Sequence, residues 1–187
     1  MSKGYTPFFS NLLQQYRLTA LDSGTREKSI KLVLKSLTIE KGFAPQQIAD
    51  KTAAHLCLAG LWLLYDYLEE CHHIAQQLET KEAAYWHAIM HRRERDFSNS
   101  KYWFQRVGEH PIFAALHSKA KNLVNNLKPD SSTFFLVKQS RWDPLAFVDV
   151  CEACVTGRAS GEDLCRQIQQ TEWQLLFDYC YKKAIGF

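Results

Sequence analysis

Histidine and carboxylate side chains gather in the middle of the sequence, in the segment from Thr80 to Pro111. His87 and His91 are four residues apart, so on one helix their imidazoles lie one turn apart and can converge on a single ion. At 100° per residue, Glu94 falls within an arc of about 60° with both histidines. This spacing predicts a divalent metal site, for zinc or iron, with His87, His91 and Glu94 as ligands.

A preceding stretch offers the remaining ligands. Asp66, Glu69 and His72 come before this segment, and Glu69 and His72 have the E-x-x-H spacing that di-iron bundles use. We expect these three side chains to complete the site from a neighbouring helix. Two known metal-site patterns do not match the sequence. Ala88 stands where H-E-x-x-H enzymes have their general-base glutamate, and the second E-x-x-H that a di-iron bundle needs is reversed here as His91-x-x-Glu94.

Two hypotheses about function remain open at this point. A metal in a polar pocket would support metal-assisted hydrolysis or oxidation. The competing hypothesis is a non-enzymatic helical interaction module, in which the same polar residues form a structural network and exposed aromatic residues contact a partner. Asp66 illustrates the choice, because a carboxylate directly after an apolar helix, if buried, needs a partner such as an arginine or a histidine.

Basic and aromatic residues in the same segment form a second candidate site. The arginines can gather around an acidic small molecule, with the aromatic rings as a pocket wall or as a surface for a partner. The opposing interpretation pairs the arginines with nearby carboxylates on a solvated face. The candidate ligand-binding residues are Arg92, Arg93, Tyr102, Trp103, Arg106 and His110.

Two runs of the sequence resemble a family of small, uncharacterised bacterial helical proteins, which has looser relatives in fungi. The runs are H-R-R-E-R-D-F-S-N-S-K-Y-W-F-Q-R-V-G-E-H-P, from His91 to Pro111, and L-W-L-L-Y-D-Y-L-E-E, from Leu61 to Glu70. Because that family has no assigned activity, the resemblance implies membership and transfers no catalytic residue.

A second likeness is to one tetratricopeptide-type helical hairpin. Ala83 to Asp96 is similar to its first helix, Ser98 to Val107 to its second, and Pro111 to its closing proline. No repeat with a period of about 34 residues is visible elsewhere in the sequence. The likeness therefore implies a single hairpin.

Helix-capping signals predict an all-α fold. We expect one domain over residues 1–187, a bundle of about seven or eight helices. The stretch from Pro45 to Leu78 is apolar on nearly all sides between Leu56 and Tyr65, which predicts a central buried helix. The segment from Lys128 to Arg141 is expected to be a loop or one isolated strand. Four prolines stand where a first helical turn accepts them, namely Pro7, Pro45, Pro111 and Pro144.

Composition narrows the expected partners to a small molecule or a protein. The chain has 187 residues, and its 46% of apolar residues is enough to fill one core. Its 23 basic and 20 acidic residues are interspersed and give a net charge of +3, which argues against nucleic acid. No apolar run is long enough for a membrane helix, and no signal peptide is evident.

Cysteine usage predicts a reducing compartment. The six cysteines occupy apolar positions of helical patterns, which is typical of free thiols, so we expect a cytoplasmic protein. Cys151 and Cys154 form a C-x-x-C, but structural zinc sites usually pair two such motifs and no second one is present. We therefore expect this pair to be part of the core.

Overall fold

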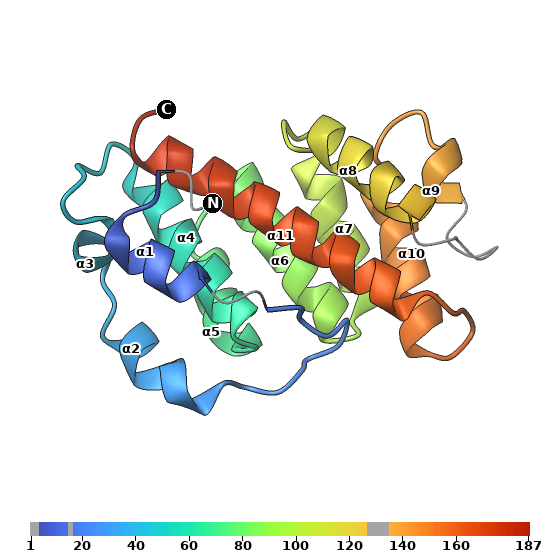
Figure 1. The fold of residues 1–187 in the computed structure, drawn as a ribbon, viewed down its shortest axis with the longest axis horizontal. Helices are drawn as coiled ribbons and strands as arrows, with labels where there is room; N and C mark the ends of the chain where they lie inside the picture. The colour runs from blue at the N-terminus through green and yellow to red at the C-terminus, as the bar shows by residue number, and fades with distance from the viewer. Residues whose placement is uncertain (1–3, 15–16, 127–134) are drawn as a thin grey trace.

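The computed structural model describes residues 4–14, 17–126 and 135–187, and every regular element in these ranges is a helix (Figure 1). The all-α prediction is therefore confirmed. The described ranges contain eleven α-helices, more than the seven or eight predicted, because some of four or five residues are too short to carry a periodic apolar pattern and because one predicted helix is two. The elements are α1 (Pro7–Leu13), η1 (Lys28–Ile30), α2 (Lys31–Lys35), α3 (Ile39–Phe43), α4 (Lys51–Leu64), α5 (Leu68–Ala75), α6 (Lys81–Arg93), α7 (Phe97–Val107), α8 (Phe113–Asn126), α9 (Phe135–Lys138), α10 (Pro144–Val155) and α11 (Glu162–Ala184).

The helix predicted from Pro45 to Leu78 is two helices, α4 and α5. Helix α4 begins only after Asp50, whose carboxylate accepts a hydrogen bond from the backbone N of Ala53 at 2.9 Å. It ends before Asp66, which has a φ of +65°. A left-handed residue cannot continue an α-helix, and the apolar pattern runs on across the break, so periodicity alone did not reveal it.

The longest helix, α11, crosses the front of the molecule in Figure 1 and packs against α4 and α8. Helix α6 packs against α4, α5 and α7. Eleven of the 14 residues of α4 are buried, and twelve of the 13 residues of α6. Burial is therefore not confined to one central helix. None of the described helices is both long and apolar enough to cross a lipid bilayer.

Helices α6 and α7 form the predicted hairpin. The hydroxyl of Thr80 accepts a hydrogen bond from the backbone N of Ala83 at 3.1 Å, and the carboxylate of Asp96 accepts one from the backbone N of Asn99 at 3.2 Å. These caps fix where both helices begin. Helix α6 also packs against α5, so the hairpin brings its histidines next to that helix.

The prediction of a loop or one isolated strand from Lys128 to Arg141 can be compared with the structure only in part. Residues 127–134 lie outside the described ranges. The next four residues form α9, which packs against α8. The isolated strand considered for this segment is therefore wrong for residues 135–138.

Candidate metal centre

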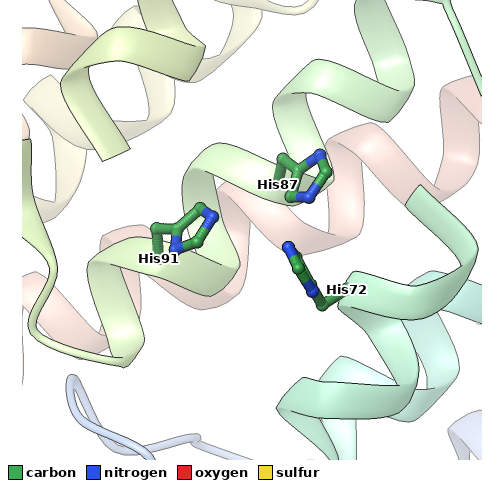
Figure 2. A group of neighbouring side chains, drawn as sticks. All are labelled: His72, His87 and His91. Atoms are coloured by element: carbon green, nitrogen blue, oxygen red, sulfur yellow. The ribbon is translucent and has the colours of Figure 1, made fainter. Parts of the chain in front are cut away.

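Three imidazoles meet between α5 and α6 (Figure 2). His72 extends from α5 toward α6, where His87 and His91 lie on successive turns. One possible ligand atom from each histidine lies within 4.8 Å of the other two. Around a tetrahedral zinc ion the ligand nitrogens are about 3.4 Å apart, given Zn–N bonds of about 2.0–2.1 Å. Small side-chain rotations would therefore bring all three nitrogens onto one ion.

His87 is the most buried member of this histidine cluster. Its side chain is 1% exposed, and neither Nδ1 nor Nε2 has a hydrogen-bond partner within the described ranges. Leaving a buried polar group unpaired costs about 1–3 kcal/mol. The indole of Trp103 stacks on the ring with centroids 4.1 Å apart, and the ring of His72 lies 4.6 Å away. An aromatic wall and a second imidazole thus surround two unsatisfied nitrogens.

The local environment favours the neutral form of His87 and His91. Burial, and next the neighbouring His72 and His91, lower the pKa of His87 to about 4. Burial also lowers the pKa of His91, although the nearby carboxylate of Glu94 acts in the opposite direction. A neutral imidazole has an unprotonated nitrogen and is the form that binds metals. At neutral pH, His87 can therefore bind a metal ion without first losing a proton.

Glu94 and Asn99 lie at the His91 side of the cluster. Glu94 Oε2 is 3.3 Å from His91 Nδ1, and Asn99 Nδ2 is 3.2 Å from His91 Nε2. A carboxylate on the second nitrogen of a ligand histidine fixes the tautomer and makes the ring more basic. Glu94 is therefore placed to orient His91 or to complete the ligand set. Asn99 was not among the predicted site residues.

Asp66 and Glu69 lie outside the cluster, contrary to the prediction that they would be metal ligands. Asp66 is buried, and its two carboxylate oxygens accept hydrogen bonds from Arg93 and from Arg17. Glu69 is 83% exposed and lies 3.8 Å from the guanidinium of Arg26. The left-handed turn at Asp66 separates this carboxylate from α5, the helix that carries His72.

Arg92 and Arg93 do not face a ligand site. Arg92 Nη2 donates to Glu172 Oε2 at 2.5 Å, and the hydroxyl of Tyr85 donates to the other oxygen of the same carboxylate at 3.0 Å. Arg93 pairs with Asp66. Both arginines thus pair with buried carboxylates from other parts of the chain, and the predicted pairing on a solvated face is wrong for them.

Of the other four predicted ligand-binding residues, Tyr102, Trp103 and Arg106 lie together on α7, and His110 lies apart from them. Tyr102 and Arg106 are exposed on α7 and contact each other, with Arg106 Nη1 3.3 Å from the Tyr102 hydroxyl. His110 is buried, and its ring lies 5.2 Å from that of Tyr85. Only Trp103 touches the histidine cluster. The six residues do not form one acidic-ligand pocket.

A cleft of about 490 Å³ lies between the α5–α6 connection and α7. Its lining includes Ala84, Trp103 and Arg106. Trp103 is shared, because it lines this cleft and also stacks on His87. The cleft and the histidine cluster are therefore adjacent, with this side chain common to both.

No protein-family model, curated protein or solved structure matches this chain. The resemblance to a bacterial family therefore stays a prediction. The function has to be inferred from the chemistry of the site itself.

Proposed function

We propose that this chain is a metal-binding protein that holds one Zn²⁺ ion through ring nitrogens of His72, His87 and His91. The observation that carries the proposal is His87, a buried imidazole with both nitrogens unpaired beside two further imidazoles. An ion would satisfy a nitrogen of His87, and its binding free energy would offset the cost of burying these groups.

The donor set favours zinc over iron. Catalytic zinc sites typically have three protein ligands, often imidazoles, and keep a fourth position open. Non-haem iron(II) sites use two histidines and one carboxylate, so iron would require Glu94 to replace one of the histidines as a ligand. Glu94 Oε2 lies 3.3 Å from His91 Nδ1, which supports an orienting role for this carboxylate in place of direct ligation.

The proposed activity is metal-assisted hydrolysis. Zinc with an open position lowers the pKa of a bound water and polarises a substrate carbonyl or phosphoryl group. Glu94 would hold the proton of His91 Nδ1 and so keep this ring in the tautomer that binds the ion, while Arg106 in the adjacent cleft favours an acidic substrate. All six cysteines lie in the described ranges and none forms a disulfide, which supports the proposed cytoplasmic location.

The test is the metal content of the purified, untagged protein, measured by inductively coupled plasma mass spectrometry before and after reconstitution with zinc. We expect about one zinc per chain in the native protein and none in His87→Phe, which keeps a ring against Trp103 but has no ligand atom. His110→Phe is the matched control, because it replaces another buried histidine, and it should retain the metal.

Two results would contradict the proposal. One is a native protein that binds no zinc after reconstitution, and the other is a His87→Phe variant that still binds a full equivalent. The first would leave the histidines as a packed aromatic cluster and favour the interaction module. If the purified protein instead contains nearly one iron per chain, the metal of the proposal becomes iron.

A further inference from the structure

Two neighbouring apolar side chains are exposed on α2. This helix and η1 contact each other at the lower left edge of the molecule in Figure 1. Leu34 is buried, whereas Leu32 is 79% exposed and Val33 is 38% exposed. At 100° per residue, Leu32 lies about 160° from Leu34 around the helix and so faces away from the protein. Among the residues that the structure describes, no other two neighbouring large apolar residues are both exposed.

Three lysines flank this apolar pair. Lys28 and Lys35 are exposed, and Lys31 is half-buried between them. Their spacing of three and four residues places them on one side of the η1–α2 segment, next to Leu32. None of the three forms an ion pair in the described ranges, and the preceding carboxylate, Glu27, lies 3.8 Å from an arginine instead. The lysine charges are therefore available to an outside partner.

The net charge of the chain is concentrated in this segment. Residues 28–41 contain four lysines and one glutamate, which gives a net charge of +3. The whole chain also has a net charge of +3, so the charges of all other residues cancel. An anionic surface therefore attracts the protein most strongly at this edge.

The composition of this edge fits a lipid bilayer better than a protein partner. The centres of protein interfaces are rich in aromatic residues, Met and Arg and poor in Lys, whereas this edge combines aliphatic side chains with lysines. Segments that lie in a membrane interface have this combination, with basic residues on the polar side and aliphatic residues directed into the headgroup region. Such contact requires no helix that crosses the bilayer.

We propose that this chain binds reversibly to membranes rich in anionic lipids. The binding site is the basic apolar surface, defined as Lys28, Lys31, Leu32, Val33 and Lys35. The lysines attract the headgroup charges, each strengthening binding by a factor of about five, and Leu32 enters the headgroup region. Because the segment is short and the attraction is screened by salt, the binding is weak and falls as ionic strength rises.

The test is co-sedimentation of the full chain with phosphatidylcholine vesicles that either contain or lack phosphatidylserine. Native protein should sediment only with the phosphatidylserine vesicles. The double variant Lys28→Gln with Lys35→Gln should bind about 30-fold more weakly. Leu32→Ser should bind about tenfold more weakly, because it removes the inserted apolar side chain without changing the charge.

The matched control removes the same charge from another part of the surface. Lys119 and Lys121 are exposed on α8, so the double variant Lys119→Gln with Lys121→Gln should bind vesicles like the native protein. His87→Phe should also bind like the native protein, because the basic apolar surface is independent of the histidine cluster. Circular dichroism verifies the fold of each variant.

Four results would overturn the proposal. The first is a native protein that does not sediment with phosphatidylserine vesicles at low salt. The second is an equal loss in the α8 control, which would mean that only the net charge matters. The third is unchanged binding in Leu32→Ser. The fourth is binding to soluble polyglutamate but not to vesicles, which would indicate an acidic protein as the partner.

Discussion

Two kinds of buried polar side chain follow one another on α6, and they differ in their partners. Arg92 and Arg93 each reach a buried carboxylate, on Glu172 and on Asp66. His87, one turn or so earlier, is equally buried and has no hydrogen-bond partner in the described part of the chain. Buried charges require fixed partners, whereas neutral imidazoles can be buried at lower cost and stay available to a ligand.

The ion pairs connect α6 to distant parts of the chain. Arg92 links α6 to α11 through Glu172. Arg93 links it to the turn after α4, and its Nε also donates to the carbonyl of Asp22 at 3.1 Å. Gly24 allows its loop to approach the Arg93–Asp66 pair closely, because a Cβ at this position would lie 2.7 Å from a carboxylate oxygen of Asp66. One set of polar residues therefore stabilises the fold, and we assign the other to binding.

Breaking the Arg92–Glu172 ion pair should have the largest effect on the free energy of unfolding. Glu172→Leu leaves a fully buried guanidinium without its carboxylate, and we expect the free energy of unfolding to fall by about 3–5 kcal/mol. Urea denaturation measures the change. The double variant Arg92→Met with Glu172→Leu removes both charges and should recover most of the loss. A loss below about 1 kcal/mol in the single variant would contradict a structural role for the pair.

Zinc should stabilise the native protein by a smaller amount. At a free zinc concentration of 100 times the dissociation constant, we expect the free energy of unfolding to rise by about 2.7 kcal/mol. His87→Phe should show no zinc-dependent rise, and without metal it should be about as stable as the native protein, because a ring replaces two unpaired nitrogens. Denaturation with zinc or a chelator tests both statements. A zinc-dependent rise in His87→Phe would place the ion elsewhere.

Glu94 should have a moderate effect on metal affinity. Glu94→Gln keeps the shape of the side chain but removes the charge beside His91, so zinc affinity should fall about 10- to 100-fold. Competition with a chromophoric chelator measures the dissociation constant. Glu69→Gln, which removes an exposed carboxylate outside the cluster, should change nothing. An unchanged affinity in Glu94→Gln would remove this residue from the site.

The smallest expected effect concerns pH. Burial lowers the pKa of His110 to about 4, against opposition from Glu82, so the folded protein keeps this ring neutral. The unfolded chain binds a proton near pH 6.5, and the free energy of unfolding therefore falls as pH drops from about 6.5 toward 4. Between pH 7 and pH 6 the expected loss is below about 1 kcal/mol. Urea denaturation at both pH values should show a smaller loss in His110→Phe, and an equal loss would contradict this assignment.

Helical spacing predicted the histidine cluster in part. His87 and His91 were predicted from their four-residue separation, and His72 from its E-x-x-H spacing with Glu69. Asp66 lies outside the cluster because it is the left-handed residue that breaks the predicted helix, and nothing in the apolar pattern marks that break. Glu69 is on α5 with His72 but faces solvent. A helical period specifies which residues share a face only as long as the helix continues.

Glu172 and Asn99 were missed for different reasons. Glu172 lies on the same stripe of α11 as Cys165 and Leu176, so its carboxylate on an apolar face was a usable signal of a buried charge. Asn99 contacts His91 across the turn between α6 and α7, a distance that depends on hairpin geometry. The partner of a buried charge is set by tertiary packing, which one sequence does not specify.

The location of the ion is the most direct test of the proposed function. Crystals of the zinc-loaded protein should be measured on both sides of the zinc absorption edge, so that an anomalous difference map identifies the metal. We predict one strong peak between the imidazoles of His72, His87 and His91. A peak at any other position, or no peak in fully reconstituted crystals, would contradict the assignment of this cluster as a metal centre.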